Sequence, residues 1–305
     1  MNRFFIILMA IVSFSLSAEE KVSIRLQWLP QAQFAGYYVA KDKGFYQNNG
    51  LDVTVMNGGP DVNGLAEVGQ GKVQFATAWL STGIEFVTKG TPVVCVGQIF
   101  PKSMLVLVTK KKSGITSIKD INNRKVGTWS GVFMTPIKAM MKINDVKPIY
   151  IKMGFDVQPF IDDKFDMAGE ITSAMLYNEY NLILSKGLKE SDLLIFNPAD
   201  FGANFPEDGI YTTKDILKNK PDVVKKFVTA SIQGWKYAID NPDEAVEILL
   251  KNQAVDKSHQ MKMLKTISSS IKVGGTVSSS LNKKDYDFVY NTLKENEMLG
   301  KKEVT

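Results

Sequence analysis

Three of the four tryptophans stand where a predicted strand ends, and small or polar residues follow each of them within a few positions: Trp28, Trp79 and Trp129. An indole ring offers a flat face for stacking and one N–H donor that needs a partner when it is buried. The loops that follow strands commonly form binding sites in α/β proteins. We therefore expect at least two of these rings to line a ligand site.

The segment that begins at Trp28 adds further rings and amides. Its first part, WLPQAQFAGYY, carries Gln31, Phe34 and Tyr37. Core packing would explain such a cluster, and so would a site that stacks a flat ligand. On the second interpretation, Gln31, Phe34 and Tyr37 are candidate ligand contacts.

A ring, an amide and a carboxylate follow another predicted strand: Tyr177, Asn178 and Glu179. Tyr177 occupies the place in its strand–turn–helix segment that Trp79 occupies in an earlier one. Asn178 and Glu179 together are suited to the donor and acceptor edge of an aminopyrimidine-like ring. Glu179 could instead only favour the dipole of the helix that it begins. Asp208 is a further candidate contact, with a turn residue before a glycine as the alternative.

The sequence offers few residues that could carry out catalysis. The one histidine, His259, lies in a polar stretch and is expected at the surface, and the one cysteine, Cys95, is expected to be a buried, unpaired thiol. The chain has no Ser/His/Asp set, no metal-ligand spacing and no dinucleotide motif. The glycine-rich segment 58–64 fits a tight turn better than an anion site, with Asp61 as the N-cap of the next helix. These features predict a binding protein without cofactor or metal, and not an enzyme.

The N-terminus and the charge indicate export. Residues 1–18 combine Arg3, an apolar run and small residues near Ala18, which is typical of a signal peptide and too short for the roughly 20 apolar residues of a membrane-spanning helix. Their removal takes away only Arg3, so the formal charge falls from +5 to +4. The lysines are scattered, and the densest run, 110–112, is expected to be a solvated strand end rather than a nucleic-acid footprint. We expect a monomer that diffuses freely in a Gram-negative periplasm.

The chain alternates strands with helices over its first two thirds. In the first hundred residues we expect strands at 22–28, 51–57, 73–79 and 93–100, with helices near 35–46 and 81–89. This succession is typical of an α/β lobe with a largely parallel sheet. The same pattern begins again after residue 103, and the C-terminal third is predicted to be helical as far as Met298.

Two extended crossings, near residues 108 and 210, are expected to join two lobes. The chain would leave the first lobe, build the second and return. Lobe 1 is then predicted to comprise 19–109 and 211–305, and lobe 2 to comprise 110–210.

Four segments carry a resemblance to a known family: LQWLPQAQFAGYYVAKDKGFYQNNGLDV, VGQGKVQFATAW, SAMLYNE and FGANFPEDGIYTTKDIL. Together they resemble the periplasmic solute-binding proteins of ABC importers, in the family related to the fungal thiamine-pyrimidine synthase. The resemblance covers essentially the whole chain after the signal peptide. It implies a type II periplasmic-binding-protein fold, in which two α/β lobes joined by a two-segment hinge close on a small molecule and deliver it to a membrane permease.

The resemblance also implies a class of ligand. Several members bind pyrimidine precursors of thiamine, and more distant relatives bind sulfonates, nitrate or riboflavin-like compounds. By this resemblance Trp28, Phe34 and Tyr37 are stacking walls, and the segment 177–179 supplies the polar edge. The fungal synthases depend on a histidine and a cysteine-rich motif that this sequence does not match. A ligand-sensing role for a receptor kinase is a further alternative, and it would need a separate partner.

Overall fold

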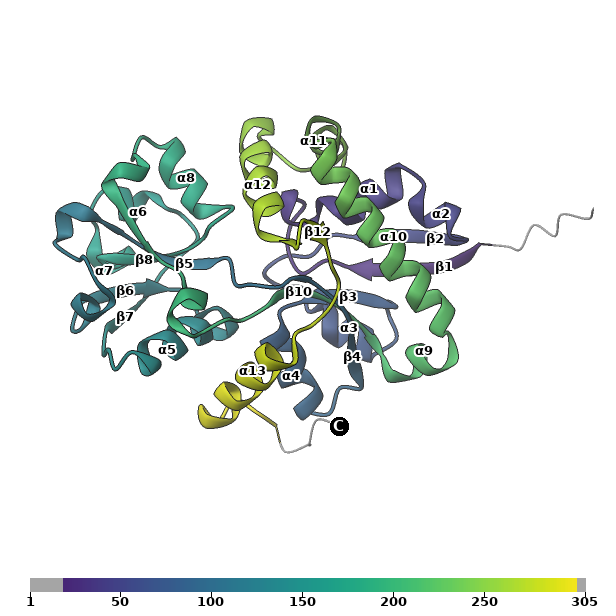
Figure 1. Cartoon of the computed structure of the whole chain (residues 1–305), viewed down its shortest axis with the longest axis horizontal. Helices are drawn as coiled ribbons and strands as arrows, with labels where there is room; N and C mark the ends of the chain where they lie inside the picture. Colours follow the sequence, from purple (N-terminus) through teal and green to yellow (C-terminus); the bar gives the residue numbers. More distant parts are fainter. Residues whose placement is uncertain (1–18, 301–305) are drawn as a thin grey trace, which may run out of the picture.

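The computed structural model of the protein describes residues 19–300, so the expected signal peptide at 1–18 lies outside the described residues. The described part forms two α/β lobes, each built on a five-stranded sheet (Figure 1). The alternation of strands and helices in the sequence predicts lobes of this class. Between residues 19 and 300, no helix combines the length and the apolar character needed to cross a bilayer.

The sheet of the first lobe has the strand order β2-β1-β3-β10-β4. Its strands are β1 (Glu20–Arg25), β2 (Leu51–Met56), β3 (Phe75–Ala78), β4 (Val93–Phe100) and β10 (Glu207–Thr213). β1 runs parallel to β2 and β3, whereas β10 runs antiparallel to β3 and β4. A strand from late in the chain therefore lies inside a sheet built from its first hundred residues.

Helices from both ends of the chain cover this sheet (Figure 1). The N-terminal ones are α1 (Ala35–Asp42), α2 (Phe45–Asn48), α3 (Gly64–Gly69) and α4 (Leu80–Thr88), after a 3-10 turn at Ala32–Phe34. The C-terminal ones are α9 (Lys214–Asn219), α10 (Pro221–Asp240), α11 (Pro242–Lys251), α12 (Lys257–Ser270) and α13 (Lys283–Glu295). A short hairpin of β11 (Lys272–Val273) and β12 (Thr276–Val277) separates the last two helices.

Gly36 allows α1 to lie directly against α10. A Cβ atom at Gly36 would fall 2.3 Å from ring atoms of Trp235, a distance at which the two helices would have to move apart. The close contact places the Tyr37 ring of α1 beside Trp235 of α10. Phe34 and Tyr37 are fully buried, and Tyr37 packs edge-on against Trp235 at a centroid distance of 6.3 Å. These two rings therefore belong to the core of the first lobe.

The sheet of the second lobe has the order β7-β6-β8-β5-β9. Its strands are β5 (Leu105–Lys110), β6 (Lys125–Thr128), β7 (Ile149–Lys152), β8 (Ile171–Met175) and β9 (Leu193–Phe196). The main helices are α5 (Met134–Ile143), α6 (Gln158–Ile161), α7 (Phe165–Ala168) and α8 (Glu179–Ser185). β5 is antiparallel to β8 and β9. Each sheet therefore contains one strand, β10 or β5, that runs antiparallel to both of its neighbours.

The crossings between the sheets differ in position from those expected near residues 108 and 210. Strand pairing puts β5 wholly in the second sheet and β10 wholly in the first. Boundaries at 109 and 210 would cut through both strands. We therefore propose that the limits of the lobes fall in the two connections, at 101–104 and 197–206.

A buried carboxylate ties the two connections together. One oxygen of Glu207, at the start of β10, accepts hydrogen bonds from the Ser103 hydroxyl and the Met104 amide, both at 2.8 Å, and from the Leu105 amide at 3.3 Å. The other oxygen has no partner among the described residues. Burial, reinforced by the charge of Asp208, raises the pKa of Glu207 to about 8.

Three local expectations are corrected. The N-cap of α3 is Asn63, whose side chain accepts from the Ala66 amide at 3.0 Å, and not Asp61. Cys95 is a free thiol but is partly rather than fully buried. Lys110 is not solvated, because only 6% of it is exposed.

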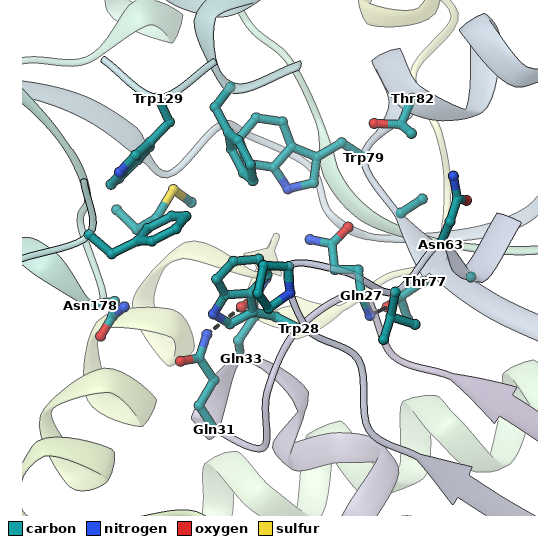
Figure 2. A pocket seen from close by; sticks show the side chains of 18 of the residues that line it. Gln27, Trp28, Gln31, Gln33, Asn63, Thr77, Trp79, Thr82, Trp129 and Asn178 are labelled. Atoms are coloured by element: carbon teal, nitrogen blue, oxygen red, sulfur yellow. Dashed lines mark hydrogen bonds between the residues drawn. The ribbon is translucent and has the colours of Figure 1, made fainter. Parts of the chain in front are cut away.

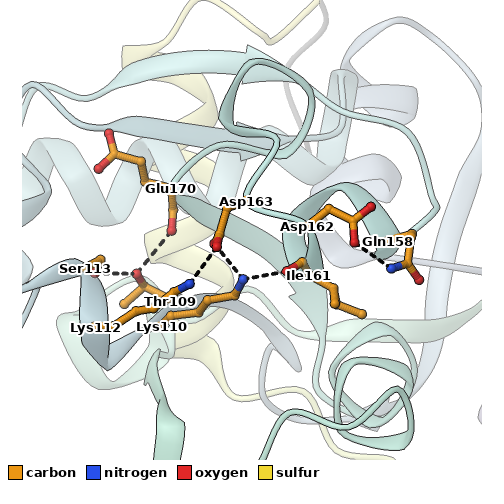
Figure 3. Close-up of polar contacts among 9 residues, drawn as sticks. All are labelled: Thr109, Lys110, Lys112, Ser113, Gln158, Ile161, Asp162, Asp163 and Glu170. Carbon is orange, nitrogen blue, oxygen red and sulfur yellow. Dashed lines mark hydrogen bonds and ion pairs between the residues drawn. The ribbon is translucent and has the colours of Figure 1, made fainter.

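The surroundings of Lys110 account for its burial. Its ammonium donates to the Ile161 carbonyl at 2.8 Å and to Asp163 at 2.6 Å, and it lies 5.1 Å from the centroid of the Phe160 ring. Lys112, which is exposed, pairs with the other oxygen of Asp163 (Figure 3). The basic run therefore anchors the loop after α6 to the end of β5.

Candidate functional site

A cavity of about 240 Å³ lies where the two lobes meet (Figure 2). Its wall comes from the loops that follow β1, β2, β3, β6, β7 and β8. The lining residues are Gln27, Trp28, Gln31, Gln33, Gly59, Pro60, Val62, Asn63, Gly64, Leu65, Thr77, Ala78, Trp79, Thr82, Trp129, Phe133, Phe155, Met175, Tyr177, Asn178 and Glu179. The carboxyl ends of strands from both lobes therefore converge on one site, as is usual for ligand sites of α/β proteins.

Five rings form an arc across this cavity and join the two lobes. Starting from the first lobe, Trp28 lies 5.4 Å from Phe155, and Phe155 stacks on Trp129 at 5.8 Å and 26°. Phe133 then packs edge-on against Trp129 at 5.8 Å and against Trp79 at 5.0 Å. These separations fall within the 4.5–7 Å range of favourable aromatic pairs. We refer to these five residues as the aromatic arc.

The loop after β2 holds Trp28 in position. The Gly58 amide donates to the Trp28 carbonyl at 2.9 Å. A Cβ atom at Gly58 would lie 2.1 Å from the Leu26 carbonyl oxygen, so only glycine permits this approach of the two loops. The glycine-rich segment thus serves as a tight turn that supports one end of the aromatic arc.

The indole N–H groups of Trp129, at the centre of the arc, and Trp79, at one end, differ in their partners. The nitrogen of Trp129 donates to the Gly154 carbonyl at 3.0 Å. The nitrogen of Trp79 is buried and has no partner among the described residues. Figure 2 shows the Trp79 nitrogen directed toward the open centre of the cavity. Because a buried donor costs free energy when it is unpaired, Trp79 is suited to a ligand acceptor.

Glutamine amides form the polar floor on the side of the first lobe. Gln31 donates to the Gln33 side-chain oxygen at 2.6 Å, and Gln33 donates to Asp208 at 2.7 Å. Gln27 donates to the other oxygen of Asp208 at 2.5 Å. Asp208 is buried behind this floor, and burial raises its pKa to about 7.

Glu179 and Asn178 form the polar edge on the side of the second lobe. The carboxylate of Glu179 accepts from the Met175 amide at 2.9 Å and from the Asn178 side chain at 2.8 Å. Only 6% of Glu179 is exposed, and burial raises its pKa to about 7. Each carboxylate oxygen keeps a second lone pair, so Glu179 can still accept a hydrogen bond from a ligand.

His259 is only partly exposed and contacts the second lobe, whereas its polar surroundings in the sequence predict a residue at the surface. It lies on α12 of the first lobe, is half-buried, and its Nε2 is 2.9 Å from the side-chain oxygen of Asn178 in the second lobe. Burial lowers the pKa of His259, and the nearby Lys262 lowers it further against the opposing effect of Asp256. Since the Asn178 amide nitrogen donates to Glu179, the neutral ring donates its Nε2–H to Asn178. This bond connects the two lobes beside the cavity.

A family model described as NMT1/THI5 like matches residues 31–245, which is more than half of the chain. The chain belongs to the NMT1/THI5 like family.

Relatives with different names are similar to this NMT1/THI5 like chain. The riboflavin-binding protein RibY of Chloroflexus aurantiacus is 26% identical over 76% of this chain and 66% of its own length, so the chain spans just under two thirds of that relative. The formylaminopyrimidine-binding protein of Halalkalibacterium halodurans is 24% identical over 77% of this chain and 72% of its own. Other relatives, from Saccharomyces cerevisiae and Legionella pneumophila, are named 4-amino-5-hydroxymethyl-2-methylpyrimidine phosphate synthase.

Solved structures show the fold. The periplasmic aliphatic sulphonate binding protein SsuA from Escherichia coli has a TM-score of 0.72 and 13% identity, covering 92% of this chain and 88% of that one. At this identity the likeness concerns the fold alone. The NMT1/THI5 like chain therefore has the periplasmic-binding-protein fold that the resemblance in its sequence implies.

Most of the residues predicted to contact a ligand do line the cavity of this family member: Trp28, Gln31, Trp79, Trp129, Tyr177, Asn178 and Glu179. Phe34 and Tyr37 do not, because both rings are fully buried in the core of the first lobe, where Tyr37 packs against Trp235 of α10. Asp208 also does not line the cavity and reaches it only through Gln27 and Gln33.

Sequence reasoning missed three important wall residues: Gln27, Phe133 and Phe155. Phe155 follows β7 by three positions, so the strand-end rule that selected the tryptophans would also have selected it. Phe133 lies in the 3-10 turn at Gly131–Phe133, which precedes α5. Gln27 directly precedes Trp28, and no sequence pattern marks it as a ligand contact.

The charge of the lining decides which ligands suit it. Glu179 is the one charged residue in the wall, and neither a lysine nor an arginine of the described residues lines it. Within residues 19–300, no group of three or more His, Cys, Asp or Glu side chains is placed to hold a metal ion. The cavity therefore suits an uncharged or cationic planar molecule with hydrogen-bonding edges.

Proposed function

We propose that this protein is the periplasmic substrate-binding component of an ABC importer, and that it binds a pyrimidine precursor of thiamine between its lobes. The aromatic arc carries this proposal. It joins rings of both lobes around a cavity whose edges are amides and one carboxylate. A flat, polar-edged ring that stacks in the cavity would contact both lobes and so favour their closure.

The size of the cavity favours one ring over three. Its volume of about 240 Å³ is below the roughly 300–1,000 Å³ typical of sites for drug-sized molecules. An aminopyrimidine is a single ring, whereas a riboflavin-like ligand carries three fused rings and a polyol chain. The relative named formylaminopyrimidine-binding protein supports the same choice.

The electrostatics of the cavity disfavour anions. Sulfonate and nitrate carry a negative charge, and a buried anion needs a cation or several N–H donors around it. The wall instead supplies the Glu179 carboxyl group and several amide oxygens. We therefore place the sulfonate and nitrate alternatives below the pyrimidine one, although a sulphonate-binding protein shares the fold.

We propose a binding role rather than synthase activity. His259 approaches the cavity from behind Asn178 and does not line it. Relatives named as binding proteins support the proposal, whereas those named as synthases keep the enzyme as the second candidate. Synthase activity predicts pyrimidine formation that is lost in the variant His259→Ala.

The location and partners follow from the same role. We propose that the signal peptide predicted at 1–18 directs the protein to the periplasm, where it works as a monomer with an inner-membrane permease. Two neighbours in fold support this placement: one is named a periplasmic aliphatic sulphonate binding protein, and another is named a ligand-binding component of an ABC-type import system. A receptor-kinase partner is the alternative, and isolating the complex from membranes separates the two.

A thermal-shift screen tests the ligand class. The panel contains 4-amino-5-hydroxymethyl-2-methylpyrimidine, its formylaminomethyl counterpart, thiamine, riboflavin, taurine and nitrate. A ligand at about 100 times its dissociation constant adds roughly 2.7 kcal/mol, which corresponds to a rise of about 5 °C or more in a protein of this size. We expect the rise with the aminopyrimidines.

Calorimetric titration of two variants then tests the site. Trp28→Ala removes one end of the aromatic arc and should weaken aminopyrimidine binding at least tenfold. Leu217→Ala, at an exposed position of α9, is the control and should leave affinity unchanged. A rise only with taurine or nitrate would refute the pyrimidine assignment, and unchanged affinity in Trp28→Ala would refute the site.

A further inference from the structure

Asp208 occupies an unusual place behind the cavity. Its side chain is buried, and its two oxygens accept from two different glutamine side chains, Gln27 and Gln33, which both line the cavity. Its backbone has a φ of 54°, in the left-handed region that few residues other than glycine adopt. Aspartate and asparagine are among the side chains that tolerate this region best.

The direction of each hydrogen bond follows from the chemistry of a carboxylate. An ionised carboxylate can only accept, so both amides must turn their nitrogens toward Asp208 and their oxygens away from it. The Gln33 oxygen then accepts from Gln31, which leaves the Gln31 oxygen without a partner among the described residues. The oxygen of Gln27 is likewise without a partner there, and Figure 2 shows the Gln27 amide at the centre of the cavity.

The resulting floor is rich in acceptors. The unpaired amide oxygens of Gln27 and Gln31 and the Glu179 carboxylate on the opposite lobe all line the same space. The buried, unpaired donor in the wall is the indole N–H of Trp79. A complementary ligand has several N–H donors and one ring acceptor on its edges.

We propose that Asp208 is a positioning residue that fixes the orientation of Gln27 and Gln33, and thereby makes the cavity select planar heterocycles that carry an amine over those that carry a carbonyl group. This inference rests on the proposed function and names the residues that set its ligand class. Asp208 acts through the two amides and does not touch the ligand.

The variant Asp208→Asn tests this directly. Asparagine has nearly the same shape and suits the left-handed backbone, but it offers one oxygen and one NH₂ group. Its NH₂ group must donate to a glutamine oxygen, which forces Gln27 or Gln33 to reverse and turn a donor toward the cavity. The control Asp52→Asn makes the same change at an exposed position of β2.

Affinities are measured by calorimetry for two matched pairs of probes at pH 8, which is above the pKa of about 7 to which burial raises Asp208. The pairs are 4-amino-5-hydroxymethyl-2-methylpyrimidine with its 4-oxo counterpart, and adenine with hypoxanthine. In the natural protein the amino member should bind about tenfold or more tightly than the oxo member. Asp208→Asn should reduce this ratio at least fivefold, and Asp52→Asn should leave it unchanged.

A ratio that stays constant in Asp208→Asn, even if both affinities fall, would show a merely structural role and overturn the proposal. A preference for the oxo members in the natural protein would overturn it as well. If Asp208→Asn does not fold, Gln27→Met removes one oriented amide at equal length and should lower the same ratio. Failure of every heterocycle to bind the natural protein would instead refute the proposed function.

Discussion

Replacing Trp79 with phenylalanine should weaken ligand binding without destabilising the free protein by much. Trp79 precedes α4, packs edge-on against Phe133 at 5.0 Å, and buries an indole N–H that has no partner among the described residues. Phenylalanine keeps an aromatic ring at this end of the arc and removes the N–H.

Two opposing terms set the stability of Trp79→Phe. The unpaired N–H costs the folded protein about 1–3 kcal/mol, and the substitution removes that cost. The smaller ring gives up buried apolar surface, a loss on the order of 1 kcal/mol. We therefore expect the free energy of unfolding to change by less than about 2 kcal/mol in either direction.

Trp79→Phe should only weaken ligand binding. A ligand that accepts a hydrogen bond from Trp79 loses about 0.5–1.5 kcal/mol in the variant, which weakens binding about 2- to 12-fold. Trp235→Phe is the control, because Trp235 is a fully buried residue of α10 that packs against α1 and does not line the cavity. Its indole N–H is also buried without a partner among the described residues, so the same two terms set the stability of this variant, and its affinity should be unchanged.

Urea unfolding gives the stabilities, and calorimetric titration with the best pyrimidine of the screen gives the affinities. Unchanged affinity in Trp79→Phe would show that the ligand does not use this donor. A loss of stability above about 3 kcal/mol would show that the indole N–H is satisfied in the free protein. Either result would refute the reasoning.

Two further predictions concern the contacts between the lobes. His259→Ala removes the bond from α12 to Asn178, so affinity should fall about 2- to 10-fold and small-angle scattering should show a smaller closed fraction with ligand; an unchanged closed fraction would contradict this role. Burial raises the pKa of Glu207 from 4.5 to about 8 and that of Glu179 to about 7. The folded protein therefore holds protons that the unfolded chain releases, and the free energy of unfolding should fall as pH rises from about 4.5 to about 8, then level off. Urea unfolding at a series of pH values should show a shallower decline in Glu207→Gln, and an equal slope would show that this carboxyl is not responsible.

Local patterns predicted the elements well where one rule decides them. β4 begins and ends at the predicted residues, 93 and 100. The strand coincides with a short apolar run, and no helical pattern overlaps it. The strand-end rule predicted that at least two of Trp28, Trp79 and Trp129 line a site, and all three line the cavity. β1 and β3 end at one edge of the first sheet, and the end of β6 in the second sheet lies at the same cavity.

Contacts between distant segments could not be predicted in this way. Phe34 and Tyr37 share a segment with Trp28, yet both are buried in the core, and Tyr37 packs against Trp235 of α10, some 200 residues later in the chain. His259 lies in a polar stretch, and only the packing of α12 beside α8 brings it to Asn178. A periodic pattern identifies a buried face but does not identify what covers it.

Adjacent residues of β10 bind one connection between the lobes and the floor of the cavity. Glu207 binds the connection at 103–105, and Asp208 binds the amides of Gln27 and Gln33. Burying two neighbouring carboxyl groups costs folding free energy, because both lose their hydration and their charges repel each other. The same groups at the protein surface would not carry this cost. Their position, where both connections between the lobes meet the ligand site, indicates that this cost serves function. A ligand that engages the amides of Gln27 and Gln33 therefore acts, through Asp208, on the strand whose first residue also binds the connection between the lobes.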